Sequence, residues 1–372
     1  MKVLFISSWF PNKLEPTNGN FVQRHAEAVA MMHDVEILHA IGDFNQKERF
    51  VFDDKNINGI RTLVVYYRNS KNPAQNFIRR MKAYKLGFDK MQKPALVHAN
   101  VLHNNMLFAV YLEKKFNIPF VVTEHWTSLR KINHHSTSKV IKFIAKYIGN
   151  KASKILPVSN DLKLSLEQLG IETPMKVVPN VVDTSLFEPI TAKRGIFTFV
   201  HISNLIPRKN ADKIVNVAIK LLKDGHQLKL NIGGDGDTEK LKQIVKEEGF
   251  EEQIEVFDTL TLPQVSEKMR SADCFILFSD DENQPCVIAE SFASGIKVIS
   301  TDVGGISEFF PDNFGVLLER QDELLLENAM KMLLKDNASN KDEISAYAKQ
   351  TFSRKAIAEQ YSEVYKSILK KA

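Results

Sequence analysis

The sequence predicts an α/β protein made of two Rossmann-like, doubly wound domains. Short β-branched runs alternate with helical patterns along the whole chain, which is typical of parallel sheets with right-handed crossovers. Many of these runs are apolar without alternation, as expected for strands that helices cover on both faces. The length of 372 residues corresponds to about two domains of roughly 150 residues each.

The predicted strands divide evenly between the two halves of the chain. In the first half they are 3–8, 35–40, 60–66, 96–99, 120–123 and 155–158; in the second half they are 197–203, 228–233, 254–257, 274–278, 297–301 and 315–318. Each is a short run of Val, Ile, Leu and Phe bounded by polar or turn residues. Helical patterns separate most of them, for example 21–32, 210–223 and 239–248.

A polar segment with Pro and Gly, residues 187–195, predicts the linker between the domains. The expected division is a first domain over 1–190, a second over 191–353, and a helix within 354–372 that returns to the first domain. Two domains of this kind would form a cleft between the carboxyl ends of their strands, where open α/β sheets bind ligands.

The modest net charge of +5 hides a division between the halves. Residues 1–190 hold 26 basic and 16 acidic side chains, whereas residues 191–372 hold 24 and 29. The basic half therefore predicts contact with an anionic surface. Ordinary composition, with 44% hydrophobic residues, excludes a collagenous or disordered chain.

Targeting signals are weak in this sequence. No apolar run reaches the 18–20 residues of a membrane span, and the short start Met1–Ser8 indicates a buried strand rather than a signal peptide. Cys274 and Cys286 have neither a disulfide framework nor a metal-ligand spacing. We therefore expect a reducing, cytoplasmic compartment.

Two loops at predicted strand ends carry candidate anion-binding groups. Gly19 lies between the first strand and a helix, where unpaired backbone N–H groups and the helix dipole favour a phosphate; a plain turn with Asn20 as N-cap is the alternative. Arg208 and Lys209 follow the strand 197–203, and such cations grip a diphosphate. The alternative for them is a solvated basic loop.

Two further strand ends are more ambiguous. Gly234-Asp235-Gly236-Asp237 matches the dinucleotide fingerprint only in part, because Glu239 stands at its third glycine position, so a turn with an N-cap is favoured over a metal–diphosphate motif. His125 ends the strand 120–123, where it is placed for proton transfer or for orienting a hydroxyl. A structural histidine is the alternative there.

The segment 280–290 is the most informative in the sequence. It follows the apolar strand 274–278, and a helix is predicted to begin near Cys286. Glu282 would then lie in the loop and Glu290 one turn inside the helix, so two carboxylates can reach opposite ends of one polar ligand, such as sugar and ribose hydroxyls. Acidic residues near a helix start are also favourable electrostatically, which is the alternative.

In their order along the chain, these segments resemble the retaining glycosyltransferases of family 4 (group 1), which have the two-domain GT-B fold. The most specific match is Glu282 and Glu290 with seven residues between them, followed by Ala-Ser-Gly-Ile-Lys-Val-Ile at 293–299 and Gly-Gly-Ile-Ser-Glu at 304–308. Two further segments are similar to family motifs: residues 178–187, and Trp-Phe-Pro at 9–11 together with Gly19. The resemblance covers nearly the whole chain.

The resemblance implies a role for each matching residue. Lys209, with Arg208, would bind the donor diphosphate and stabilise the leaving group in place of a metal, so no metal or other cofactor is expected. Glu282 would contact the donor sugar near its reacting centre, Glu290 would bind the ribose hydroxyls, and His125 would line the junction of donor and acceptor. The other implied donor-binding positions are Gly19, Asn204, Asn283, Gln284, Pro285, Cys286 and Val287.

The chain departs from the family pattern at several positions. Asn204 stands where an Arg that binds phosphate is usual, and Arg208 is the candidate replacement. Lys297 replaces a usual Pro, and Val181 a usual Gly. The implied activity is retaining transfer from a nucleotide sugar to a glycan or lipid-linked acceptor in cell-surface polysaccharide synthesis. A nucleotide-sugar epimerase of the same fold stays open, as does a nucleotide- or nucleic-acid-binding module without transferase activity, although the modest charge disfavours nucleic acid.

The basic excess of the first half concentrates in two predicted helices. Lys139, Lys142 and Lys146 fall within about 60° on a helical wheel at 100° per residue, and Arg79 and Arg80 belong to the second helix. Basic amphipathic helices dock on anionic membranes. This predicts a peripheral position on the inner face of the cytoplasmic membrane, and a solvated basic face is the alternative.

Overall fold

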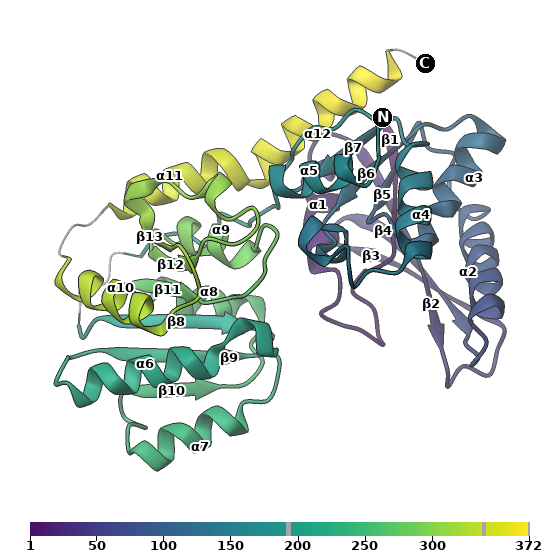
Figure 1. Ribbon diagram of the computed structural model, residues 1–372. Helices are drawn as coiled ribbons and strands as arrows, with labels where there is room; N and C mark the ends of the chain where they lie inside the picture. Colours follow the sequence, from purple (N-terminus) through teal and green to yellow (C-terminus); the bar gives the residue numbers. More distant parts are fainter. Residues whose placement is uncertain (191–194, 337–339, 371–372) are drawn as a thin grey trace. The chain divides into compact units, whose positions relative to one another are not determined.

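The computed structural model describes residues 1–190, 195–336 and 340–370, and its chain forms two compact units (Figure 1). Unit 1 comprises Met1–Val181 and Arg354–Ala372, and unit 2 comprises Val182–Ser353. Each is an α/β unit with a mainly parallel sheet, as the sequence predicts. The chain enters unit 2 before residue 190, because Val182 and Phe187 are buried in the core of that unit. The predicted linker extends over residues 191–194, which lie outside the described residues.

The sheet of unit 1 has the strand order β3-β4-β2-β1-β5-β6-β7. All neighbours pair in parallel except β3 and β4, which form an antiparallel hairpin. The strands are β1 (Lys2–Ser7), β2 (Asp34–Asp43), β3 (Phe50–Ile57), β4 (Ile60–Arg68), β5 (Leu96–Asn100), β6 (Phe120–Glu124) and β7 (Lys154–Pro157).

Helices cover both faces of this sheet and bury two apolar clusters against it. They are α1 (Asn20–Ala30), α2 (Pro73–Phe88), α3 (Leu107–Phe116), α4 (Lys139–Gly149), α5 (Asn160–Gln168) and α12 (Arg354–Leu369), with short 3-10 turns η1 (Asn104–Met106), η2 (Thr127–Leu129) and η3 (Lys131–Asn133). The apolar strands predicted from the sequence therefore lie between two helical layers.

The helix α12 belongs to unit 1 although unit 2 precedes it in the chain. Its Ile357, Tyr361 and Tyr365 are buried in the same cluster as Val3 and Phe5 of β1. The two tyrosines also join a polar network beneath the sheet: the hydroxyl of Tyr361 lies 2.7 Å from His25 Nδ1, and that of Tyr365 lies 2.5 Å from His98 Nδ1. Residues 354–369 thus complete the core of the first unit.

The sheet of unit 2 is parallel throughout, in the order β10-β9-β8-β11-β12-β13. Its strands are β8 (Thr198–Ser203), β9 (Lys229–Gly234), β10 (Ile254–Phe257), β11 (Cys274–Leu277), β12 (Lys297–Thr301) and β13 (Gly315–Leu318). Its helical segments are η4 (Pro207–Lys209), α6 (Ala211–Lys223), α7 (Glu239–Glu248), α8 (Leu262–Arg270), α9 (Cys286–Ala293), η5 (Ser307–Phe309), η6 (Asp312–Phe314), α10 (Glu323–Lys335) and α11 (Lys341–Phe352). The chain runs outward from β8 to β10 and then returns to β11, so a topological switch point lies between β8 and β11.

The strand β3 is the element that the sequence analysis missed. Its residues are mostly exposed or half-buried, and Asp53, Asp54 and Lys55 interrupt any apolar run. It pairs with β4 through a tight turn at Asn58 and Gly59, both with positive φ, of 51° and 84°. An Asn-Gly turn of this kind is the usual two-residue hairpin connection.

Candidate active site

The strongest cluster of predicted site residues lies at the switch point of unit 2. Parallel strands present their carboxyl ends at one edge, and ligands of open α/β sheets bind where the strand order reverses. The turn η4 follows β8, and the loop 278–285 follows β11, the next strand in the sheet. Lys209 and Glu282 are therefore brought together from positions 73 residues apart.

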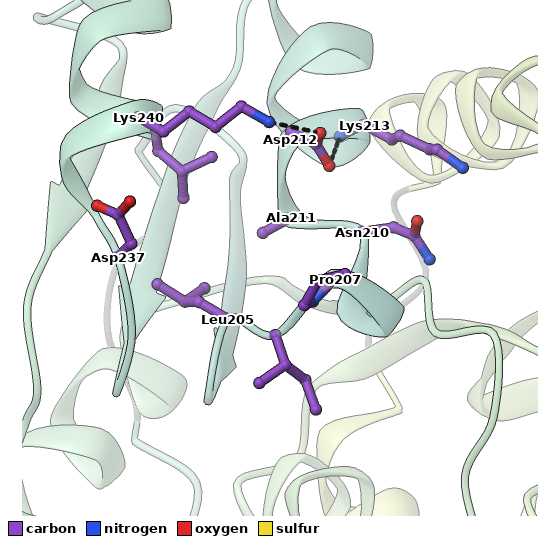
Figure 2. Close-up of a pocket in the computed structure, with 10 residues that line it drawn as sticks. Leu205, Pro207, Asn210, Ala211, Asp212, Lys213, Asp237 and Lys240 are labelled. Atoms are coloured by element: carbon purple, nitrogen blue, oxygen red, sulfur yellow. Dashed lines mark hydrogen bonds and ion pairs between the residues drawn. The ribbon is translucent and has the colours of Figure 1, made fainter.

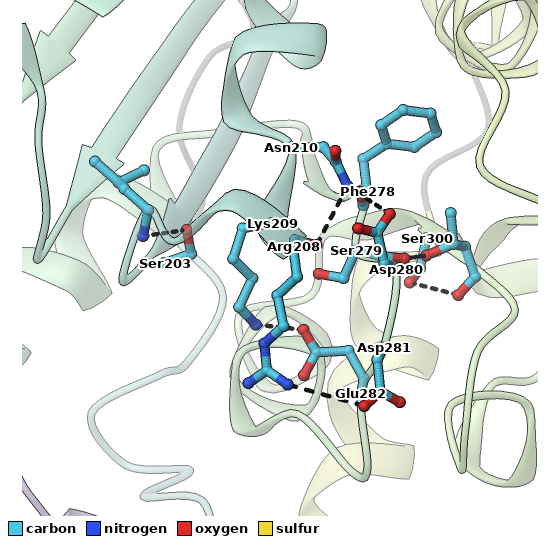
Figure 3. A network of polar contacts seen from close by, with 12 residues as sticks. Ser203, Arg208, Lys209, Asn210, Phe278, Ser279, Asp280, Asp281, Glu282 and Ser300 are labelled. Atoms are coloured by element: carbon cyan, nitrogen blue, oxygen red, sulfur yellow. Dashed lines mark hydrogen bonds and ion pairs between the residues drawn. The ribbon is translucent and has the colours of Figure 1, made fainter. Parts of the chain in front are cut away.

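Lys209 and Glu282 form a buried ion pair, with Lys209 Nζ donating to Glu282 Oε1 (Figure 3). Their residues are only 9% and 6% exposed. The neighbouring Arg208 is half-buried, and its Nη1 lies 3.9 Å from Asp281 Oδ2. Two neighbouring cations thus face two neighbouring carboxylates at one sheet edge.

Backbone and side-chain hydrogen bonds hold the two loops together. Asp280 N–H donates to the carbonyl of Arg208 at 2.9 Å. Asn210 Nδ2 donates to the carbonyl of Phe278 at 3.0 Å and to Asp280 Oδ1 at 2.9 Å (Figure 3). Asn210 and Leu205 both have positive φ, of 51° and 49°. Left-handed non-glycine residues of this kind cluster where a structure constrains a functional loop.

The helix α9 begins at Cys286, as the sequence predicts, and places the second glutamate. Asn283, Gln284 and Glu290 are all buried. Gly305 N–H donates to the carbonyl of Asn283 at 3.0 Å, which ties the loop before α9 to the segment after β12. The N-terminal N–H groups of a helix have no partner within the helix, and its dipole favours negative charge there. Pro285 and Val287 flank this helix start and are half-buried.

The glycines of the 234–237 loop serve close packing. A Cβ at Gly234, whose φ is 138°, would lie 1.9 Å from the carbonyl oxygen of Ser203, and one at Gly236 would lie 2.8 Å from that of Asn204. Asp237 Oδ1 accepts the N–H of Glu239 at 3.1 Å, as a turn before a helix requires. This agrees with the turn that the sequence analysis favoured.

A cavity of about 490 Å³ lies beside this loop. Figure 2 shows Asp237 and Lys240 on one side of it and Asp212 and Lys213 on the other. Lys240 Nζ donates to Asp212 Oδ2 at 3.2 Å, which links the start of α7 to the start of α6. The floor is apolar, from Leu205 and its neighbours, so this cavity has walls of both charges.

In unit 1, aromatic side chains gather at the carboxyl ends of β1 and β6. The ring centroids of Trp9 and Trp126 lie 6.0 Å apart, edge to face, and those of Phe21 and His125 lie 4.3 Å apart. Gly19 precedes α1 with a φ of 77° and acts as its N-cap, rather than Asn20. A Cβ there would lie 2.4 Å from the backbone carbon of Trp9, so only glycine fits.

His125 lies where the sequence predicts it, just after β6. Burial and the neighbouring His25 and His98 hold its pKa well below the usual range. The imidazole is therefore neutral at physiological pH and suited to orienting a hydroxyl rather than to carrying charge. A hydrogen bond with Asn180 opposes this shift.

Glu124 is a buried carboxylate that the sequence analysis overlooked. It accepts the N–H groups of Leu102 at 2.5 Å, His125 at 2.8 Å and Trp126 at 2.6 Å. Burial raises its pKa to about 7, against the opposing effect of these hydrogen bonds. Beside it, Val101 has a φ of 70°, which is costly for a β-branched residue. The two together fix the loops after β5 and β6, and a polar residue at a strand end was the available signal.

The basic residues of unit 1 do not form one surface. On α4, Lys139 and Lys146 are exposed, whereas Lys142 Nζ donates to the carbonyl of His134 at 2.9 Å. On α2, Arg79 Nη1 donates to the carbonyl of Arg68 at 2.6 Å. Arg80 turns toward the sheet instead, where its guanidinium donates to the Tyr67 hydroxyl at 3.0 Å and to Asn105 Oδ1 at 2.5 Å.

The exposed face of α4 is also apolar. Val140 and Phe143 are 66% and 72% exposed, and Tyr147 is exposed as well. The helix buries instead its Ala145, Ile148 and Gly149. Among the described residues, no helix is both long enough and apolar enough to cross a bilayer.

Comparison with protein families decides the identity of the chain. Residues 184–351 match the model of glycosyl transferases group 1, and residues 19–186 match that of Glycosyltransferase Family 4. The chain belongs to the family 4, group 1 glycosyltransferases. It is thus a glycosyltransferase, and its two units correspond closely to the two matched regions.

Relatives by sequence are distant. This glycosyltransferase is 24% identical over 357 residues to the putative teichuronic acid biosynthesis glycosyltransferase TuaC of Bacillus subtilis, covering 89% of this chain and 88% of that one. It is 28% identical over 203 residues to a phosphatidylinositol N-acetylglucosaminyltransferase subunit of Arabidopsis thaliana, a match that covers 53% of this chain and 45% of the relative. The chain therefore spans about half the length of that relative.

Solved structures of the same fold cover the whole chain. Sucrose-phosphate synthase from Thermosynechococcus elongatus is 17% identical with a TM-score of 0.80, over 100% of both chains. HepE from Anabaena, in complex with UDP and glucose, is 18% identical with a TM-score of 0.77, over 99% of this chain and 100% of the other. The glycosyltransferase therefore has the GT-B fold.

Proposed function

We propose that this glycosyltransferase transfers a sugar from a nucleotide-diphosphate donor, with retention of anomeric configuration and without a metal. The buried pair of Lys209 and Glu282 at the switch point of unit 2 carries the proposal. In the proposed donor complex, Lys209 Nζ turns from Glu282 toward the diphosphate, and Glu282 contacts the donor sugar. The UDP and glucose bound by HepE, a structure of the same fold, support a nucleotide-sugar donor.

The electrostatics of the site fit the departure of a nucleoside diphosphate. Negative charge develops on the leaving diphosphate, and fixed cations and backbone dipoles in a site shielded from water stabilise it without reorganisation. Lys209 and Arg208 supply the cations, and the N-terminus of α9 supplies the dipole. Glu290, buried one turn inside α9, is the proposed partner of the ribose hydroxyls.

Unit 1 is the proposed acceptor unit. The neutral imidazole of His125 and the indole rings of Trp9 and Trp126 lie at the carboxyl ends of its strands, where they offer hydrogen bonds and flat apolar surface to a saccharide. The similarity over most of its length to TuaC, a putative teichuronic acid biosynthesis enzyme, supports a glycan or lipid-linked acceptor in cell-surface polysaccharide synthesis.

Binding of nucleotide sugars is the direct test of the donor site. We expect one of the UDP-, GDP- or ADP-sugars to raise the melting temperature, because a ligand that binds only the folded state stabilises it. In Glu290→Ala, the same shift in melting temperature should require an at least tenfold higher concentration of the nucleotide sugar. Unchanged affinity in that variant would contradict the site, and NMR of the product would report its anomeric configuration.

Removal of metal ions tests the proposed chemistry separately. Transfer measured with EDTA should equal transfer with added Mg²⁺ or Mn²⁺, because Lys209 and Arg208 neutralise the diphosphate. A strict metal requirement would contradict this and would direct attention to Asp235 and Asp237.

We further propose that α4 docks the enzyme on an anionic membrane. Lys139 and Lys146 lie on a helix whose Phe143 is exposed, and such helices bind by apolar burial together with electrostatic attraction. Lys139→Glu with Lys146→Glu should release the protein from vesicles that contain phosphatidylglycerol. The matched control is Lys229→Glu with Lys246→Glu, two exposed lysines of unit 2. Equal release by both pairs would contradict docking through α4.

A further inference from the structure

A second concentration of positive charge lies in unit 1. A cavity of about 650 Å³ opens beside the first turns of α2. Its walls come from the turn after β2, the last residue of β4, and α2 itself. The lining residues are Lys47, Arg49, Arg68, Asn72, Ala74, Gln75, Ile78 and Arg79. Half of these described residues are cationic, and none is acidic.

The cations of this cavity lack acidic partners. Within the described ranges, no carboxylate lies within 4.0 Å of the charged groups of Lys47, Arg49, Arg68 or Arg79. Arg61, at the other end of β4, is the contrast: its guanidinium pairs with Asp54 at 2.8 Å and with Glu36 at 3.1 Å. Like charges that share a cavity without counter-charges create a local potential that attracts anions.

Hydrogen bonds to backbone groups hold the walls of the cavity in place. Arg68 N–H donates to the carbonyl of Arg49 at 3.2 Å, and Arg79 Nη1 donates to the carbonyl of Arg68 at 2.6 Å. Asn72 Oδ1 accepts the N–H groups of Ala74 and Gln75 and so caps α2. A ligand would therefore meet a preformed site and would lose little affinity to the ordering of loops.

The position in the sheet connects this cavity with the proposed acceptor side. Strands β2 and β4 run parallel to β1, so their carboxyl ends lie at the same sheet edge as the loops that carry Gly19 and His125. Arg68 is the last residue of β4, and Lys47 and Arg49 follow β2. The cavity thus opens on the ligand-binding edge of unit 1.

We propose that this cavity binds a phosphate or diphosphate group of the acceptor. This inference rests on the proposed function of unit 1 as the acceptor unit. Guanidinium groups bind phosphate oxygens in a bidentate manner, and Arg49, Arg68 and Arg79 supply three of them with Lys47 as a compact fourth charge. Ile78 adds an exposed apolar wall for the group that carries the phosphate.

Titration of the full chain with inorganic pyrophosphate tests the site. The titration is made with a saturating concentration of whichever nucleoside diphosphate (UDP, GDP or ADP) the protein binds, so that the donor diphosphate site in unit 2 does not contribute. We expect Arg49→Gln with Arg68→Gln to weaken pyrophosphate binding at least tenfold. Lys82→Gln with Lys85→Gln, which removes two exposed charges of α2 outside the cavity, should change it less than twofold. Added salt should weaken the wild-type binding.

The outcomes separate this site from the donor site. Equal loss in the two pairs of variants, or no pyrophosphate binding by the wild type at low salt, would overturn the proposal. Binding of UDP, GDP and ADP, each measured alone, reports on the donor site, so failure of all three would contradict the proposed function and not the cavity. Vesicles with and without phosphatidic acid then distinguish the two sources of the phosphate group. Binding to vesicles that needs both phosphatidic acid and the two arginines assigns a lipid headgroup. Binding of pyrophosphate without binding to such vesicles assigns a soluble phosphate.

Discussion

At the scale of single residues, the pair of Lys209 and Glu282 combines a structural and a chemical role. Breaking a buried ion pair from one side leaves an uncompensated charge, at a cost of about 3–5 kcal/mol in the free energy of unfolding. We therefore expect Lys209→Met to destabilise unit 2 and to abolish transfer. The double variant with Glu282→Gln should regain most of the stability and none of the activity, as thermal unfolding and a transfer assay would show. Recovery of activity in the double variant would contradict a role for the lysine in chemistry.

Gly19 allows an equally sharp test, because the chain holds a matched glycine. Gly19 and Gly59 have φ values of 77° and 84°, but a Cβ at Gly19 would collide with the backbone of Trp9, whereas one at Gly59 would meet nothing within 4 Å. Gly59→Ala should cost only the left-handed conformation, about 1–2 kcal/mol. Gly19→Ala should cost clearly more and should reduce transfer. Equal changes in the free energy of unfolding would contradict this, because they would show that the loop accommodates a Cβ at Gly19.

The sequence predicts which side chains meet where a motif and a strand end coincide. Lys209 and Glu282 follow strands that the apolar pattern marks, so their meeting follows from parallel topology. Glu124 was missed because its three bonds are to backbone N–H groups, so only its position as a polar residue at a strand end marks it in the sequence. Arg80 was expected on the surface with Arg79, but the hydrogen bonds of its guanidinium to Tyr67 and Asn105 come from tertiary contacts.

At the scale of elements, prediction from the sequence again depends on whether an element leaves a pattern in it. The twelve predicted strands were marked by apolar runs and are all confirmed, whereas β3 lacks such a run because it is an edge strand with little burial. Its Asn58-Gly59 turn was the overlooked signal. On α4 the apolar residues Val140 and Phe143 are exposed, whereas Ala145 and Ile148 are buried. Periodicity gives the faces of a helix, and only packing decides which face is covered.

The attachment of α12 can be tested through its tyrosines. Tyr361→Phe removes the hydroxyl that lies 2.7 Å from His25 Nδ1 and 3.3 Å from Thr123 Oγ1, which leaves buried polar atoms without this partner. A loss of about 1–3 kcal/mol in the unfolding free energy is expected. Tyr147→Phe, on the exposed side of α4, should cost less than half as much. Denaturant unfolding of both variants makes the comparison, and equal values would argue against a structural role for the network.

At the scale of the whole molecule, buried histidines make stability depend on pH. Burial lowers the pKa of His25 to about 3 and that of His39 and His201 to about 4. An unfolded histidine has a pKa of about 6.5, so below that pH the unfolded chain binds protons that the folded chain does not. The free energy of unfolding should therefore fall as the pH drops from about 6.5 toward 4, by about 1.4 kcal/mol per pH unit for each histidine.

Glu124 acts in the opposite direction. Its pKa of about 7 exceeds the unfolded value of about 4.3, so its contribution decreases as the pH rises between these values. The titration of Glu124 cancels the effect of one histidine, so the free energy of unfolding still decreases on acidification. Replacing His39 with Gln should lower the slope of unfolding free energy against pH by about 1.4 kcal/mol per unit near pH 5. An unchanged slope would show that His39 does not titrate in this way.

The return of α12 to unit 1 has a consequence for synthesis on the ribosome. Domains generally fold as units, and the N-terminal one folds first as the chain emerges. Here the core of unit 1 needs Tyr361 and Tyr365, which are translated only after all of unit 2. Unit 2, which is continuous in sequence, can therefore complete its fold before the last helix of unit 1 has been translated. The half of the enzyme that is made first is the half that is finished last.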